Sequence, residues 1–203
     1  MKKMKKKDLE IRLENVDPHP HPDPDLEQYQ TPSDLAADIL FTAFINGHIK
    51  GKRVIDLGCG TGILSLGAGL LDAEEVHGYD IDEDSIEVAK NFAKKWNLSG
   101  RVSFDKKDIK NLRSKCDTVI MNPPFGSQTK GADLPFLKKS FEISDQVYTI
   151  HNYKTLDFLR DFISKMGHEI FLERGYELTI KRTFDFHTKE RENIEVVIFG
   201  IKV

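Results

Sequence analysis

The sequence predicts an α/β fold of the doubly wound type, in which helices cover both faces of a mostly parallel sheet. Three observations lead to this prediction. Short apolar strand patterns alternate with helical patterns from residue 53 onward. A glycine-rich turn joins the first of these strands to the helix that follows it. The last two apolar segments have no helix between them, which indicates an antiparallel hairpin at the end of the sheet.

Composition limits the class of protein. The chain has 203 residues, of which 39% are hydrophobic and 31% are charged, so it can bury one core and is neither disordered nor fibrous. A net charge of −3 is not that of a strongly basic nucleic-acid binder. Cys59 and Cys116 form no CxxC pair, and no metal site is expected. No apolar run approaches the ~20 residues of a membrane span, and we expect a cytoplasmic protein.

One domain is the simplest count for a chain of this length, with an N-terminal helix and proline-rich linker over residues 1–25 and the main domain over residues 26–203. Leu9, Leu13 and Val16 recur at helical spacing and predict a short amphipathic helix. Alternating prolines over residues 17–24 then force an extended linker. We expect solvated polar side chains here. The weaker alternative is a metal site that includes His19 and His21.

The remaining elements follow in order. Thr31 is expected to cap a helix that continues through Leu35–Ile45, with Pro32 in its first turn. The strands expected next are Arg53–Leu57, Val76–Asp80, Val102–Asp105, Asp117–Met121 and Val147–His151. The helices expected between and after them are Ile63–Leu71, Asp84–Trp96, Phe136–Ile143 and Leu156–Met166. Tyr176–Phe186 and Ile194–Val203 alternate in hydrophobicity and are expected to form the hairpin.

The turn after the first strand is typical of a cofactor site. Residues 56–62 read DLGCGTG, and Ile63 stands where a dinucleotide fingerprint would have its third glycine. The DxGxGxG form is instead that of methyltransferases. Asp80 ends the second strand about 20 residues after these glycines. At this position a carboxylate can accept hydrogen bonds from the ribose hydroxyls of a ligand. Asp108 follows the third strand, and its carboxylate can accept a hydrogen bond from an adenine amino group. These residues fall at the carboxyl ends of consecutive strands, where open α/β sheets bind ligands.

The end of the fourth strand carries the sequence NPPF, residues 122–125. An exocyclic amine on a purine is a poor nucleophile, because its lone pair is delocalised into the ring. Two carbonyl groups can accept hydrogen bonds from the two N–H groups of the amine: the side-chain carbonyl of Asn122 and the backbone carbonyl of Pro123. These hydrogen bonds can direct the nitrogen lone pair toward a methyl donor. Pro124 completes the motif, and Phe125 can stack on a displaced base. The motif therefore predicts methylation of an amino group.

Taken together, these motifs resemble the methyltransferase-like protein 5 family, whose members are N6-adenosine methyltransferases of small-subunit ribosomal RNA. The resemblance rests on QYQTP at 28–32, DLGCGTG, GYDIDED at 78–84, VIMNPPFG, KGAD at 130–133 and VYTIH at 147–151, and it covers essentially the whole chain. It implies a seven-stranded, Rossmann-like class I methyltransferase sheet that binds S-adenosyl-L-methionine. One departure is a loop after His187 that is less uniformly basic than in the family.

The resemblance also assigns the site residues. It implies that Gln28 and Thr31 hold the methionine end of the cofactor. The other expected cofactor contacts are Asp56, Gly58, Gly60, Asp80, Ile81, Asp108, Ile109 and Asn122. The catalytic segment is Asn122, Pro123, Pro124 and Phe125.

The implied partners are small-subunit ribosomal RNA and a small zinc-ribbon activator subunit. We expect the subunit to pair with the edge strand 102–105. Two other functions remain open. A protein-glutamine N5-methyltransferase faces the same lone-pair problem at a carboxamide nitrogen, although those enzymes usually have a tyrosine after the prolines. A non-catalytic ribosome-assembly scaffold could bind the cofactor without chemistry. A DNA adenine methyltransferase is disfavoured, because no target-recognition domain is evident.

Overall fold

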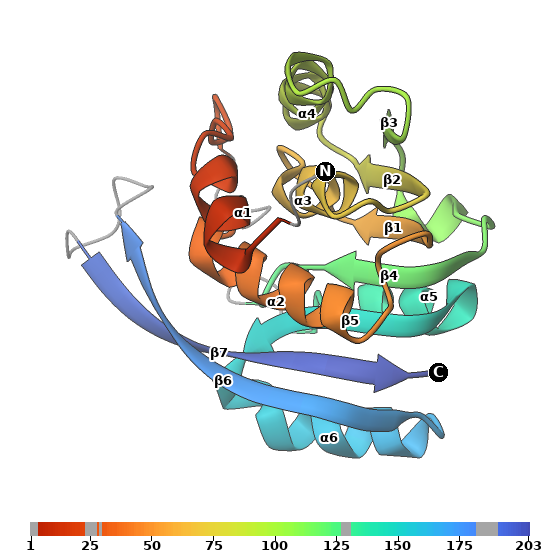
Figure 1. The fold of residues 1–203 in the computed structure, drawn as a ribbon. Helices are drawn as coiled ribbons and strands as arrows, with labels where there is room; N and C mark the ends of the chain where they lie inside the picture. The colour runs from red at the N-terminus through yellow and green to blue at the C-terminus, as the bar shows by residue number, and fades with distance from the viewer. Residues whose placement is uncertain (1–3, 23–27, 29, 127–130, 182–190) are drawn as a thin grey trace.

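The protein is described here by a computed structural model, which covers residues 4–22, 28, 30–126, 131–181 and 191–203. One seven-stranded sheet has the order β3-β2-β1-β4-β5-β7-β6. Neighbouring strands from β3 to β5 are parallel, whereas β7 is antiparallel to both β5 and β6 (Figure 1). The strands are β1 Arg53–Leu57, β2 Glu75–Asp80, β3 Val102–Lys106, β4 Cys116–Met121, β5 Ser144–Asn152, β6 Glu169–Lys181 and β7 Arg191–Lys202. The predicted fold class, including the terminal hairpin, is confirmed.

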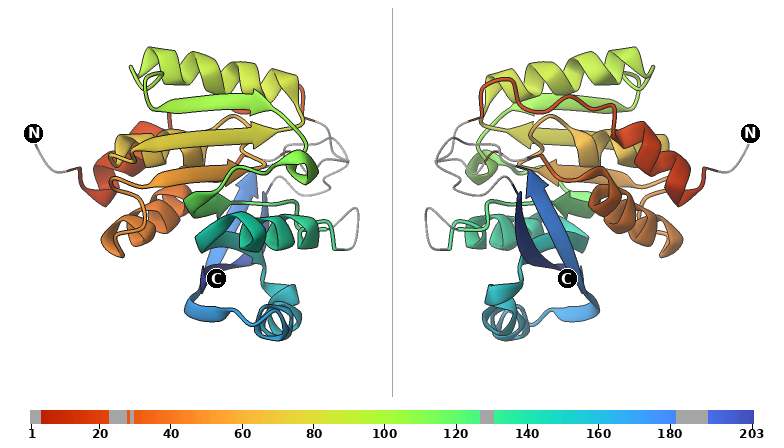
Figure 2. Two further views of the ribbon diagram at one scale, coloured as in Figure 1. Left: turned by 90° about the vertical axis from the view of Figure 1, so that its right-hand side faces the viewer. Right: turned by 90° about the vertical axis from the view of Figure 1, so that its left-hand side faces the viewer.

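Helices cover both faces of the sheet. They are α1 Lys6–Leu13, α2 Ser33–Ile45, α3 Ile63–Leu70, α4 Glu83–Lys95, α5 Leu134–Ile143 and α6 Leu156–Lys165, with short 3-10 turns η2 Ile109–Asn111 and η3 Tyr153–Thr155. Adjacent residues of one strand point to opposite faces, so Val54 packs in a core with α1–α4 and Ile55 in a core with α5 and α6 (Figure 2). Among the described residues, no helix is long and apolar enough to cross a membrane.

The first helix is part of the main core. Leu9 and Leu13 are fully buried in the same cluster as residues of α2 and α3. A Cβ atom built at Gly67 of α3 would lie 2.4 Å from Leu40 and 3.5 Å from Leu13, so the three helices meet closely at this glycine. α1 therefore contributes to the core that supports the rest of the sheet.

Two sequence-based expectations need correction. α2 begins at Ser33, its N-cap is Pro32, and Thr31 makes no capping contact, because the Thr31 hydroxyl bonds another side chain described below. β6 begins at Glu169 rather than at residue 176. An irregularity in register between Ile170 and Leu172 and a glycine at 175 interrupt the alternation that marks a strand in sequence. The expected end of this strand, residues 182–186, lies outside the described residues.

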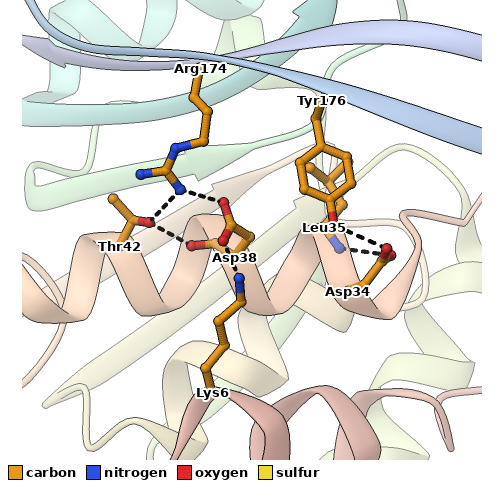
Figure 3. A network of polar contacts seen from close by, with 7 residues as sticks. All are labelled: Lys6, Asp34, Leu35, Asp38, Thr42, Arg174 and Tyr176. Carbon is orange, nitrogen blue, oxygen red and sulfur yellow. Dashed lines mark hydrogen bonds and ion pairs between the residues drawn. The ribbon is translucent and has the colours of Figure 1, made fainter.

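A polar network joins the two N-terminal helices to β6. The buried carboxylate of Asp38 on α2 accepts hydrogen bonds from Lys6 of α1 and from Arg174 of β6, the latter at 2.6 Å (Figure 3). One turn earlier on α2, Asp34 accepts a 3.0 Å hydrogen bond from the hydroxyl of Tyr176 (Figure 3). In Figure 1 the β6–β7 hairpin extends past the ends of the other strands beside α1 and α2. The network fixes the base of this hairpin against α2.

The topology also determines where a ligand can bind. β1 lies between β2 and β4, and the chain order reverses between β1 and β4. In open α/β sheets, ligands bind in the crevice at the carboxyl ends of the strands at such a reversal. The DLGCGTG turn after β1 and the NPPF sequence after β4 both lie at this edge.

Candidate functional site

A cavity of about 410 Å³ lies at this edge of the sheet. Of the residues expected from the sequence, those that line it are Gln28, Thr31, Asp56, Gly58, Gly60, Asp80, Ile81, Asp108, Ile109, Asn122 and Pro124. Pro123 and Phe125 are not among the described lining residues. Segments as far apart in the sequence as Gln28 and Asn122, 94 positions, thus meet around one space.

The glycine-rich turn forms one wall. Its first residues, Gly58 and Cys59, donate backbone hydrogen bonds of 2.8 and 3.0 Å to the carbonyl of Tyr79 on β2. Gly60 has a φ of +50°, and a Cβ atom at this position would meet no atom within 4 Å. The left-handed conformation favours glycine, and the open space over the turn leaves bare backbone available to a ligand.

Asp80 holds this turn in place. One of its carboxylate oxygens accepts a 2.8 Å hydrogen bond from the Gly60 amide, and the other accepts a 3.0 Å hydrogen bond from the Asp82 amide. Burial raises the pKa of Asp80, and the amide hydrogen bonds oppose that rise. Each oxygen still has a second lone pair. Asp80 can therefore support the turn and accept ligand hydroxyls at the same time.

Asp56 is the buried carboxylate of the turn. Its Oδ2 accepts hydrogen bonds from the Ser65 amide at 3.0 Å and the Ser65 hydroxyl at 2.6 Å, whereas its Oδ1 has no hydrogen-bond partner among the described residues. Burial raises the pKa of Asp56 to about 7, although the Ser65 hydrogen bonds lower it. A buried acceptor without a partner is unfavourable by about 1–3 kcal/mol. Its position in the cavity wall indicates that a ligand cation or N–H group normally supplies the partner.

The opposite wall comes from the segment after β3 and from Ile81. Asp108 accepts a 2.9 Å hydrogen bond from the Lys110 amide and so begins the η2 turn, whose Ile109 is buried. Ile81 is 51% exposed although it lines the cavity. Two apolar side chains in the lining, with a carboxylate next to Ile109 in the sequence, suit a flat aromatic ring that has an amino substituent.

Asn122 is the central polar group at the end of β4. Its Nδ2 donates a 2.9 Å hydrogen bond to the Thr31 hydroxyl, which lies 91 positions away in the sequence. The Asn122 Oδ1 is buried and has no hydrogen-bond partner among the described residues. In this orientation of the amide, Asn122 lines the cavity, and its Oδ1 has no hydrogen-bond donor among the described residues. The sequence predicts that this oxygen accepts a hydrogen bond from an amine.

The rest of the motif is placed differently. Pro123 is buried, and Pro124 lines the cavity. Phe125 is 9% exposed, and its side chain packs in the core shared with α1–α4. The structure therefore places the Phe125 ring behind the cavity wall, and a base-stacking role for it remains a prediction.

Several lining residues were missed in the sequence. They are His19, Gln30, Cys59, Thr61, Ile63, Leu64, Tyr79, Ser85, Lys107, Lys110, Ala132, Pro135 and Phe136. His19 is the least expected, because its side chain is 7% exposed and its Nε2 lies 2.9 Å from Asp82 Oδ1. Asp82 also caps α4 through the Ser85 amide, and this bond together with His19 lowers the pKa of Asp82 despite burial. The expectation of a solvated linker is wrong at His19, and an alternating His-Pro pattern gives no sequence signal for such a contact.

These features fit S-adenosylmethionine. The unpartnered Asp56 oxygen suits a cationic group, the open backbone at Gly60 allows close approach, and Asp80 and Asp108 provide acceptors on consecutive strands. Each contact type is present where a class I methyltransferase sheet binds this cofactor. When it is bound, the sulfonium supplies an activated methyl group.

Comparison with known proteins supports this assignment. A family model described as a methyltransferase domain matches residues 48–162. The chain is 36% identical to the rRNA N6-adenosine methyltransferase METTL5 of Danio rerio, over 95% of this chain and 96% of the fish protein. It is 30% identical to Mettl5 of Drosophila melanogaster, over 100% of this chain and 99% of that protein. A solved structure from Pyrococcus horikoshii, described as a candidate RNA methyltransferase, is 39% identical, with a TM-score of 0.91 and 98% of both chains covered.

The pKa of Asp56 predicts a pH-dependent affinity for the cofactor. Below pH ~7 the buried carboxyl is mostly protonated in the free protein, and a bound cation favours the carboxylate, so that binding releases a proton. The dissociation constant for S-adenosylmethionine should fall by up to about tenfold per pH unit as the pH rises toward ~7, and should then level off. Titration calorimetry at a series of pH values measures this change.

The variant Asp56→Asn is the control for this measurement, because the pKa of neighbouring Asp80 is raised as well. Its affinity should be lower and nearly independent of pH over the same range. An unaltered protein whose affinity stays constant across this range would contradict the assignment of Asp56 as the titrating group.

Proposed function

Because this chain belongs to the METTL5 family of rRNA N6-adenosine methyltransferases, we propose that it methylates the N6 amino group of an adenosine in small-subunit ribosomal RNA, with S-adenosylmethionine as methyl donor. The observation that supports this most strongly is the buried Asn122 Oδ1, which faces no donor of the described protein. A cytoplasmic location, as predicted from the sequence, is consistent with this substrate.

The chemistry depends on how the amine is held. An adenine N6 amine has two N–H groups in the plane of the ring, and its lone pair is part of the ring's π system. Asn122 Oδ1 can accept a hydrogen bond from one N–H, and the Pro123 carbonyl can accept a hydrogen bond from the other. Two acceptors outside the ring plane favour a pyramidal nitrogen, which localises the lone pair for attack on the methyl carbon. The new N–C bond would form as the S–C bond of the sulfonium breaks, with S-adenosylhomocysteine as the leaving group, and the proton lost by the amine would pass to solvent water.

The chain offers positioning rather than a strong base. Thr31 holds the Asn122 amide through a single hydrogen bond, and Pro123 has a fixed φ that directs its carbonyl. A sulfonium methyl is already activated, so that orientation of the two reactants can provide about 7–11 kcal/mol of the barrier reduction. Aligned acceptors add electrostatic stabilisation as positive charge develops on the nitrogen.

The alternatives are less well supported. A glutamine amide could also bind to Asn122 and Pro123, but the relatives that match over almost the whole chain are adenosine methyltransferases, and the motif ends in Phe125. A scaffold without activity has no need for a buried acceptor that lacks a partner. The sequence after His187, where this chain departs from the more uniformly basic pattern of the family, lies outside the described residues as far as position 190.

We also propose that a small zinc-ribbon activator subunit pairs with β3. This strand is at one edge of the sheet, and Ser103 and Asp105 on it are exposed. An edge strand presents unpaired N–H and C=O groups that a strand of another chain can extend. The net charge of −3 gives a further reason, because a partner can supply positive surface for RNA.

Removal of the Asn122 amide should abolish the reaction. The variant Asn122→Ala is expected to reduce methyl transfer to small-subunit rRNA by about 10²–10³-fold, because one of the two acceptors for the amine is lost. The measurement uses labelled S-adenosylmethionine followed by nucleoside analysis for N6-methyladenosine. Asn91→Ala, on the exposed face of α4, is the matched control and should keep the full rate.

Two results would contradict the proposed function. One is N6-methyladenosine formed by Asn122→Ala at the rate of the unaltered protein. The other is label on a glutamine of a protein, with none on RNA, which would favour the glutamine methyltransferase.

Pairing with the activator subunit should protect the backbone amides of β3 from hydrogen exchange. Hydrogen exchange of the backbone amides at 102–106 is expected to slow when the purified subunit is added, whereas exchange at 169–174 in β6, the other edge of the sheet, serves as the internal control. The rate of RNA methylation should rise in parallel. A chain that is soluble, monomeric and fully active by itself would contradict this partner assignment.

A further inference from the structure

Two sequence motifs that the proposed reaction does not use meet inside the structure. Asp133 ends the KGAD sequence, and His151 ends the VYTIH sequence on β5. The His151 Nδ1 lies 2.9 Å from Asp133 Oδ2, and its Nε2 lies 2.9 Å from the Thr149 hydroxyl. His151 and Thr149 are fully buried, and Asp133 is 6% exposed. We call these three residues the Asp133 cluster.

A neutral imidazole satisfies every contact of the cluster. A carboxylate can only accept a hydrogen bond, so the proton is on Nδ1 of His151. Nε2 then accepts a hydrogen bond from the Thr149 hydroxyl. Thr149 and His151 alternate along β5 with Tyr148 and Ile150, which lie in the other core, so both point to the sheet face that α5 covers.

The position of Asp133 shows that the contact is specific. Asp133 is the N-cap residue of α5, where an aspartate usually accepts a hydrogen bond from an amide of the first helical turn. It makes no such capping bond, and proline occupies one of the first two helical positions. The carboxylate instead accepts from His151 of β5. The Asp133 side chain therefore fixes the start of α5 to the sheet.

The first turn of α5 belongs to the cavity. Ala132, Pro135 and Phe136 line it together with Asn122 and Pro124. Phe136 also packs over the glycine-rich turn, since a Cβ atom at Gly58 would lie 3.0 Å from its ring. On the sheet, Thr149 is paired with Met121, the residue before Asn122. The cluster thus links the wall that contains Phe136 to the strand pair that ends in the catalytic motif.

We propose that Asp133, His151 and Thr149 are positioning residues that fix the first turn of α5, and with it Phe136, relative to Asn122 and the glycine-rich turn. This inference rests on the proposed methyl transfer for its effect on rate. Its structural part concerns only the placement of α5. The cluster does not touch the reacting atoms, because His151 and Thr149 are completely buried.

The test compares variants of the cluster with a matched control on the same strand. Asp133→Ala removes the contact to His151, and Thr149→Val is a milder change that removes only the hydroxyl. Asp133→Asn keeps an acceptor oxygen at the same place. The control is Tyr148→Phe, which removes a buried hydroxyl that contacts Asn46 at 3.0 Å and His48 at 2.8 Å, away from the cavity.

Two readouts separate positioning from general stability. Hydrogen exchange at amides 136–140 should become faster in Asp133→Ala and in Thr149→Val, but not in Tyr148→Phe. The kcat for RNA methylation should fall by about 10²-fold in Asp133→Ala, the loss expected for a misplacement of about 1 Å, with little change in KM. Asp133→Asn should recover most of the rate and of the protection.

Several results would overturn the inference. Unchanged exchange at 136–140 in both Asp133→Ala and Thr149→Val would do so, as would an equal loss of kcat in Tyr148→Phe. An Asp133→Asn variant as impaired as Asp133→Ala would exclude the hydrogen bond as the cause. If the unaltered protein does not methylate RNA but exchange responds as expected, the proposed function fails and the role of the cluster in placing α5 stands.

Discussion

The hydrogen bond from Asn122 to Thr31 is the contact on which the site depends. It holds the Asn122 amide at the cavity through Nδ2, and the buried Oδ1 has no hydrogen-bond donor among the described residues. Thr31 makes this bond instead of capping α2. A favourable local contact of the helix is thereby exchanged for a contact between distant segments, which is common where function constrains structure.

The fold supplies the framework for that bond. Parallel pairing of β1 with β4 brings the glycine-rich turn and Asn122 to the same edge of the sheet. Asp80 fixes the turn through the Gly60 amide, and Asp38 joins α1 and β6 to α2, on whose N-terminal side Thr31 lies. Each of these groups is held by hydrogen bonds within the protein, so the cavity walls are largely formed without a ligand. Such a site favours catalysis by orientation.

Much of this was predictable because it follows from local patterns. The strand–helix alternation, the DLGCGTG turn and the position of NPPF placed Asp56, Asp80 and Asn122 at one edge of the sheet. Contacts between remote side chains left no comparable signal. His19 lies in a proline-rich segment that reads as a solvated linker, yet it bonds Asp82. Phe125 follows the two prolines of the NPPF sequence but packs into the core, because side-chain direction after a strand depends on tertiary packing.

The most direct test of the account is the single-turnover rate of methyl transfer in Thr31→Val, measured at saturating S-adenosylmethionine and RNA. Valine preserves the shape of the side chain and removes the hydroxyl that holds Asn122. The account predicts a rate lower by about 10- to 100-fold, the range seen when groups that orient metal ligands are removed, with the fold and the product unchanged. A rate equal to that of the unaltered protein would contradict it, because Asn122 would then be oriented without Thr31.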